Sequence, residues 1–235
     1  MITLRKINNI AIIELNNEEQ NKFNPFFVQA LLKILDELRE DQDAKALIFV
    51  GQHQKYFSLG FDTDWAKAHS SEEVTAFFAE AHKVLYQTLL FPKPTIACIN
   101  GHAFGLGAIW ASAFDFRVMN SYRGWFCFSS VNIGIKVPPA MISLSDSIIP
   151  TPYKNELLLM GAQLSGIEAQ KRGVVHSAHA PESLLDEAIK LAKILITKDP
   201  QCYAITKDVI RQDIATILKN AGSEGLPFTT SSSEN

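Results

Sequence analysis

The 235-residue sequence lacks most features of secreted, membrane-spanning and metal-binding proteins. Its three cysteines, Cys98, Cys127 and Cys202, have neither the spacing of a zinc site nor the even number of a disulfide framework. No apolar run reaches the roughly 18 residues of a membrane span, and the start, Met1 to Lys6, lacks the apolar core of a signal peptide. The last residues do not form a peroxisomal Ser-Lys-Leu-type address. We therefore expect a cytoplasmic protein with no metal and no membrane insertion.

The sequence also lacks clusters of charge of one sign. The 22 Lys and Arg residues and the 25 Asp and Glu residues give a formal net charge of −3 and are scattered along the chain. No basic run or face is present, so nucleic acid is not an expected partner. Because 47% of the residues are hydrophobic, the chain can bury one sizeable core. A small molecule or a protein is the expected partner.

The first 120 residues alternate between strand and helix patterns, which predicts an α/β fold with a parallel sheet. Asn24 and Pro25 mark one helix start, and Ser70 with Glu73 forms the capping-box pattern of another. The predicted elements are two short strands within 2–15, a helix from 25, a strand at 46–50, a helix from 70 to about 90, and strands at 95–99 and 116–119.

The last 100 residues are mainly helical in pattern. We predict short helices at 140–147, 153–160 and 166–172, a last strand or extended link at 173–175, and longer helices at 182–196 and 203–220. The final helix carries an apolar stripe, from Ile205 to Leu218, that needs a partner surface. The tail from Ala221 is rich in Ser, Thr and Gly and is expected to be disordered.

The stretch from Lys93 to Asp115 is the strongest functional signal. It predicts a buried strand, Thr95 to Ile99, followed by a break at Asn100-Gly101 and an apolar helix that starts through Gly105-Leu106-Gly107. The start of such a helix presents free backbone N–H groups and the positive end of the helix dipole. This arrangement suits a phosphate, a carboxylate or a developing oxyanion.

Two motifs in order, at 55–62 (Lys-Tyr-Phe-Ser-Leu-Gly-Phe-Asp) and at 94–107, resemble the crotonase (enoyl-CoA hydratase/isomerase) superfamily. The sequences around Trp65-Ala66 and from 122 to 134 look most like its Δ3,Δ2-enoyl-CoA isomerase branch. The resemblance implies a crotonase-like (ClpP/crotonase) core of stacked ββα turns over 1–200, and C-terminal helices. It places the helix at 201–220 at a homotrimer or hexamer interface and leaves 221–235 as a tail. The implied ligand is an acyl-CoA thioester, with CoA as part of the substrate and no separate cofactor.

The resemblance also assigns roles to individual residues. The backbone N–H groups of Phe61 and Leu106 would form an oxyanion hole for the thioester oxygen. Gly60 and Gly105 would let the backbone approach the ligand, and Leu59 would offer its carbonyl to the adenine. The remaining expected substrate contacts are the cations Lys22, Lys55 and Lys67 for the CoA phosphates, Ile109 and Trp110 for an apolar acyl wall, and Asn132 for a water or the acyl carbonyl.

The sequence departs from the family at both of its catalytic glutamates, which are replaced by Ile109 and Ser130. A serine hydroxyl cannot replace a carboxylate base, because it needs a base of its own. Hydration, which uses both carboxylates, is therefore not expected. Asp62, Asp64 and His102 are titratable residues nearby in sequence, but Asp62 is more typical of a helix cap and His102 of a structural histidine.

Three interpretations remain open from the sequence. The first is an enoyl-CoA isomerase whose base lies elsewhere in the chain. The second is a catalytically silent acyl-CoA-binding homologue. The third is a decarboxylase or thioesterase of the same fold, which does not depend on a strong base.

Overall fold

A computed structural model describes residues 2–221 of the chain. The predicted disordered tail falls outside the described residues except for Ala221, which is the last residue of a helix. Within the described part, no helix is both long enough and apolar enough to cross a membrane.

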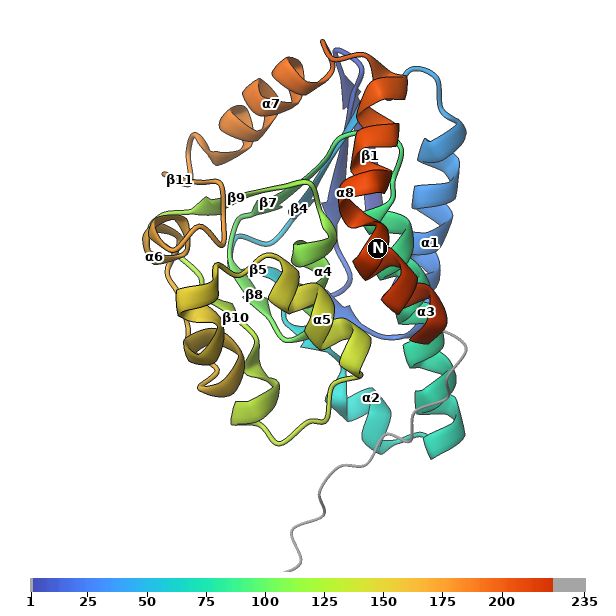
Figure 1. Cartoon of the computed structure of the whole chain (residues 1–235), viewed down its shortest axis with the longest axis vertical. Helices are drawn as coiled ribbons and strands as arrows, with labels where there is room; N and C mark the ends of the chain where they lie inside the picture. The colour runs from blue at the N-terminus through green and yellow to red at the C-terminus, as the bar shows by residue number, and fades with distance from the viewer. Residues whose placement is uncertain (1, 222–235) are drawn as a thin grey trace, which may run out of the picture.

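A six-stranded sheet forms the centre of the molecule (Figure 1). Its strands, in spatial order, are β1 (Ile2–Ile7), β2 (Ile10–Leu15), β4 (Ala46–Gly51), β7 (Thr95–Ile99), β9 (Phe116–Asn120) and β11 (Ser177–His179). The β1–β2 hairpin is antiparallel and turns at Asn8 and Asn9, both with positive φ, while the other neighbours are parallel. The two short strands predicted within 2–15, the parallel sheet and the α/β class are confirmed.

Alternate side chains of the central strands enter two separate cores. On one face, Leu47 and Phe49 of β4 pack under α1 (Pro25–Glu40), α3 (Ser71–Leu89) and α4 (Leu106–Ala113). On the other, Ile48 and its neighbours pack under α7 (Leu184–Leu195), which lies apart from the other long helices in Figure 1. Because both faces of the sheet are buried, the central strands are continuously apolar.

The predicted helix starts are confirmed by their caps. Asn24 accepts a hydrogen bond from the Phe27 amide at 2.9 Å, with Pro25 as the first residue of α1. At α3, Ser70 and Glu73 form a reciprocal capping box. These side chains satisfy amides that a helix start leaves without a backbone partner.

Five short strands, none of them among the predicted elements, bring the two sequence motifs together. They are β3 (Lys22–Phe23), β5 (Tyr56–Ser58), β6 (Gly60–Phe61), β8 (His102–Phe104) and β10 (Phe126–Cys127). β5, β8 and β10 form a three-stranded sheet, and β3 pairs with β6. Since β5 and β6 carry the first motif and β8 precedes α4, the pairing sets the first motif beside the start of α4.

The segment from 129 to 179 differs in detail from the prediction. A 3₁₀ turn (Ser129–Asn132) precedes α5 (Pro139–Ser147), and the helix predicted at 153–160 is instead a 3₁₀ turn (Thr151–Tyr153) followed by a π-helix (Asn155–Leu159). α6 spans Gly166–Lys171 as predicted. The last strand is β11, at 177–179 rather than at 173–175. The amides of Val174 and Val175 instead bond back to the Ala169 carbonyl and close the end of α6.

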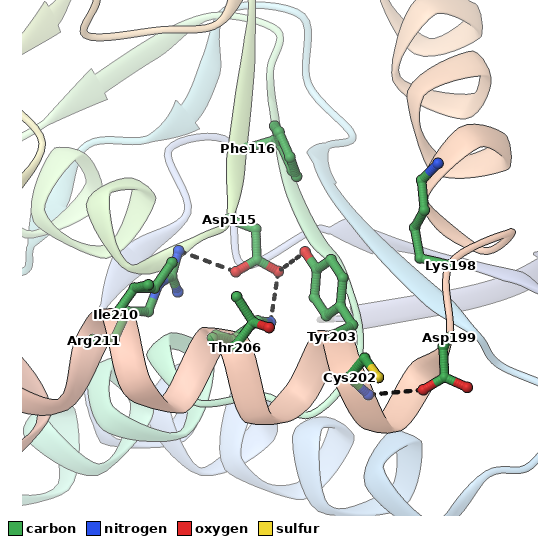
Figure 2. Close-up of a pocket in the computed structure, with 10 residues that line it drawn as sticks. Asp115, Phe116, Lys198, Asp199, Cys202, Tyr203, Thr206, Ile210 and Arg211 are labelled. Atoms are coloured by element: carbon green, nitrogen blue, oxygen red, sulfur yellow. Dashed lines mark hydrogen bonds and ion pairs between the residues drawn. The ribbon is translucent and has the colours of Figure 1, made fainter.

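The last helix, α8 (Pro200–Ala221), is held to the sheet layer by a buried ion cluster (Figure 2). Asp115, 6% exposed, lies 2.6 Å from Lys207 Nζ and 3.0 Å from Arg211. Tyr203 donates its hydroxyl to the same carboxylate at 3.0 Å, and the Thr95 amide donates at 2.8 Å. The predicted apolar stripe is only partly buried: Leu218 is buried, while Ile205, Val209 and Ile210 are exposed.

The two cations of α8 also bond to the C-terminal ends of α3 and α4. Lys207 donates to the carbonyl of Phe91, and Arg211 donates to the carbonyls of Leu89 and Ala113. Leu89 and Ala113 are the last residues of α3 and α4, so their carbonyls have no partner within their own helices, and a cation there is favoured by the helix dipole. α8 therefore fixes the far end of α4, whose other end faces the candidate site.

Candidate active site

A small pocket of about 60 Å³ lies where the two motifs meet. Its walls come from β6, α2 (Thr63–Lys67), α3, α4, the 3₁₀ turn after β10, and α5. The lining residues are Leu59, Phe61, Thr63, Phe78, Gly105, Leu106, Ile109, Ser129, Ser130, Ile133, Ile135, Lys136, Val137 and Met141.

The backbones of the two motifs are in close contact at Gly60. A β-carbon on Gly60 would lie 2.4 Å from the Phe104 carbonyl oxygen and 2.8 Å from the Leu106 nitrogen, and the residue has φ +88°. A side chain is excluded there on both grounds. The glycine therefore allows the Gly60-Phe61 backbone to approach the first amide of α4.

The start of α4 is open to a negatively charged ligand. Gly105 occupies the N-cap position with φ +49°, and no side chain caps the helix. The first backbone bond of the helix comes from Ile109, whose amide donates to the Gly105 carbonyl. The amides before Ile109, including that of Leu106, have no partner within the helix, and the helix dipole adds positive potential.

The rest of the pocket is mainly apolar. The Phe61 ring lies 5.0 Å from the Phe78 ring between centroids, and Ile109 and Met141 are buried. Such walls keep water away and strengthen the interaction of a backbone N–H with developing charge. The geometry suits a neutral ligand on which a negative oxygen forms.

Most of the residues predicted for the oxyanion site meet at this pocket. Leu59, Phe61, Gly105, Leu106 and Ile109 line it, as does Ser130, and Gly60 lies directly beside them. The wall residues that the sequence did not single out include the apolar Phe78, Val137 and Met141. Their only signal is apolar character at helical or turn positions, which core residues share.

Two of the predicted substrate contacts lie elsewhere. Trp110 does not line the pocket; it is fully buried among the rings of Phe23, Phe49 and Phe114, and its Nε1 donates to Thr88 Oγ1. Neighbouring residues of α4 therefore have different environments: Ile109 lines the pocket, and Trp110 packs in the core. Asn132 donates its side-chain amide to the Gly161 carbonyl at 2.9 Å and orders the loop after β10.

The three predicted lysines do not line the pocket. Lys22 and Lys67 converge on Asp64, at 3.4 and 3.9 Å. Lys55 lies over the Tyr56 ring, 5.2 Å from its centroid. Two of the three are thus grouped at α2, while Lys55 lies in the turn just before β5.

The titratable residues near the motifs have other partners. Asp62 caps α2 by accepting from the amides of Asp64 and Trp65, both at 3.2 Å. His102 accepts from the Trp125 amide, and burial and the charge of Lys55 lower its pKa. Among the described residues that line the pocket, none is a carboxylate or a histidine. Burial raises the pKa of the Cys98 thiol to about 12, as expected for a core cysteine.

Comparison with known proteins decides the family. The sequence profile described as "Enoyl-CoA hydratase/isomerase" matches residues 5–224. The chain belongs to this family. It is 30% identical over 226 residues to Enoyl-CoA delta isomerase 3 of Arabidopsis thaliana, covering 93% of this chain and 95% of that protein. It is also 30% identical over 240 residues to the peroxisomal Enoyl-CoA delta isomerase 2 of the same plant, covering 98% and 99%.

Solved structures identify the fold. The crystal structure of a probable enoyl-CoA hydratase from Mycobacterium tuberculosis H37Rv matches with a TM-score of 0.88 at 23% identity, covering 94% of this chain and 92% of that one. A family member from a Pseudomonas species matches equally well, with a TM-score of 0.88. The predicted crotonase fold with C-terminal helices is confirmed.

Proposed function

We propose that the protein is an enoyl-CoA isomerase that moves the double bond of a 3-enoyl-CoA into conjugation with the thioester. The observation that carries this proposal is the contact between the Gly60-Phe61 backbone and the first turn of α4, which sets two sources of amide N–H groups around one apolar pocket. The two curated delta isomerases that the chain resembles over nearly its whole length support the same reaction.

The reaction needs an enolate, and the pocket supplies its stabilisation. The thioester oxygen accepts from the backbone amides of Phe61 and Leu106 while a proton leaves C2, and the charge moves onto that oxygen. Removing one such donor typically costs about 10²–10³-fold in rate, so two are a large part of the catalysis. The proton then returns at C4.

Backbone donors place no demand on the side chains at their positions, so Phe61 and Leu106 can also serve as apolar wall. In this proposal Leu59 offers its carbonyl to the adenine, and Lys22, Lys55 and Lys67 bind the CoA phosphates. CoA is part of the substrate, and the proposal includes no separate cofactor. The exposed Ile205, Val209 and Ile210 of α8 are the proposed contact of a homotrimer or hexamer.

Hydration is not proposed, because no carboxylate is among the described residues that line the pocket and could position and split water. The same observation favours a second candidate, a silent acyl-CoA-binding protein that keeps the thioester site without a base. A decarboxylase or thioesterase with the same oxyanion site would also work without that carboxylate.

The deciding experiment incubates the purified protein with a 3-enoyl-CoA and follows the conjugated 2-enoyl product by absorbance. An active delta isomerase in a parallel cuvette is the control. Product formation supports the isomerase. A flat trace together with acyl-CoA binding in calorimetry would establish the silent binder, and release of free CoA thiol would establish a thioesterase.

A further inference from the structure

His82 on α3 is a buried polar group that the proposed chemistry has not yet used. His82 is 4% exposed, and its Nδ1 lies 2.7 Å from the Phe78 carbonyl oxygen. Its other ring nitrogen, Nε2, has no hydrogen-bond partner among the described residues. Buried side-chain polar atoms are nearly always paired, so an unpaired one needs a specific explanation.

The Phe78 carbonyl determines which nitrogen of His82 carries the proton. A carbonyl can only accept, so Nδ1 donates to it and, in the neutral ring, Nε2 holds a free lone pair. Burial lowers the pKa of His82, which favours the neutral ring at pH 7. The side chain is therefore an oriented imidazole with its basic nitrogen unprotonated. This is the state that a general base requires.

His82 is next to the pocket wall rather than in a remote core. Its bond to the carbonyl four residues earlier folds the ring back over the turn that carries Phe78, and the two positions share one face of α3. Phe78 lines the pocket and contacts the Phe61 ring at 5.0 Å. His82 therefore lies one helical turn from Phe78, a wall residue of the pocket.

Contact between His82 and a ligand would require this wall to move, because His82 is not among the residues that line the pocket. Phe78 is the wall residue one helical turn before His82, so it is the side chain that would have to rotate. Rotation of Phe78 toward solvent would extend the pocket to His82.

We propose that His82 is the base of this site, acting through Nε2 on the C2 proton of a bound acyl-CoA once Phe78 has moved. The proposal rests on the isomerase function above. The C2–H electron pair becomes the C1–C2 double bond of a dienolate, and His82 becomes an imidazolium. The oxygen lone pair then re-forms the carbonyl, the C1–C2 pair moves to C2–C3, and the C3–C4 pair takes the proton at C4. No water or redox partner is used.

The test separates proton removal from isomerisation. Butyryl-CoA is incubated with the protein in D₂O, and loss of the C2 proton signal is followed by ¹H NMR, while 3-enoyl-CoA conversion is measured in parallel. The variant is His82→Asn, whose side-chain amide keeps a donor for the Phe78 carbonyl but has no basic nitrogen. The matched control is His69→Asn, because exposed His69 makes the same contact, Nδ1 to the Trp65 carbonyl at 2.7 Å.

We expect His82→Asn to bind butyryl-CoA as the wild type does but to lose both activities by about 10²-fold or more, the usual contribution of a general base. His69→Asn should keep both activities. Wild-type rates in His82→Asn would overturn the role of His82 and leave the isomerase standing. A wild-type protein that neither exchanges nor isomerises would overturn both.

Folding of the variant need not limit the test, because the unaltered protein offers a second measurement. In protein with ¹⁵N-labelled histidine, a saturated acyl-CoA that reaches His82 should shift its Nε2 resonance and leave that of His69 in place. An unchanged Nε2 resonance at saturating ligand would contradict the proposal.

Discussion

Removing the charge of Asp115 should loosen α8 at a predictable cost. Asp115→Asn keeps the shape of the side chain but leaves Lys207 and Arg211, whose side chains are 4% and 16% exposed, without a carboxylate. Breaking a buried ion pair from one side typically costs 3–5 kcal/mol. The asparagine oxygen can still accept from Tyr203 or Thr95, and both cations keep their carbonyl partners, so we expect the lower end, about 3 kcal/mol.

Urea denaturation followed by circular dichroism measures this cost directly. With an m-value of about 2–3 kcal/mol/M, a loss of ~3 kcal/mol lowers the midpoint by about 1–1.5 M. Both proteins are compared at the same concentration, because association would add to the apparent stability.

A matched control is Asp199, which lines the same surface pocket as Asp115 (Figure 2). Asp199 is exposed and accepts from the Cys202 amide at 2.8 Å near the start of α8. Asparagine caps a helix as well as aspartate does, so Asp199→Asn should change stability by less than about 0.5 kcal/mol. Equal midpoints for the two variants would refute the role assigned to the Asp115 cluster.

Two further predictions concern the site. Ser130→Glu places a carboxylate in the pocket. Added to His82→Asn, it should raise the rate of D₂O exchange by at least about tenfold, as expected for a positioned base. No recovery in a folded double variant would show that Ser130 does not face the C2 proton. Stability should fall as the pH drops below about 6.5, because unfolded histidine binds a proton there, while buried His82, with its lowered pKa, binds one only at lower pH. Urea midpoints at pH 5, 6, 7 and 8 should show this slope in the wild type and a shallower one in His82→Asn; identical slopes would contradict it.

The sequence predicted the elements that are long or clearly capped. Asn24 with Pro25 and Ser70 with Glu73 marked the helix starts, because capping chemistry is local. The two- and three-residue strands such as β6 and β8 were not predicted, since they are defined by pairing across the chain rather than by a pattern of their own. The π-helix at Asn155–Leu159 was not predicted either, because its apolar spacing is that of an ordinary short helix.

The site was predictable where backbone geometry leaves a mark in the sequence. Gly60 and Gly105 both have positive φ and both stood out. Side chains were harder to place, as neighbours on α4 show: Ile109 lines the pocket, while Trp110 points into the core. Their difference depends on how α4 is rotated against the sheet, which the sequence alone does not give. His82 and Phe78 were overlooked because they occupy ordinary buried-face positions of α3.

The most direct test of the central claim, that backbone amides near Phe61 and Leu106 stabilise an enolate, is the ultraviolet spectrum of bound acetoacetyl-CoA, whose enolate absorbs more strongly than its keto form. Titrating the protein into this ligand should raise the enolate absorbance. Gly60→Ala, whose new β-carbon would lie 2.8 Å from the Leu106 nitrogen, should abolish that rise. Binding of acetoacetyl-CoA in calorimetry with no change in the enolate band of the wild type would contradict the account.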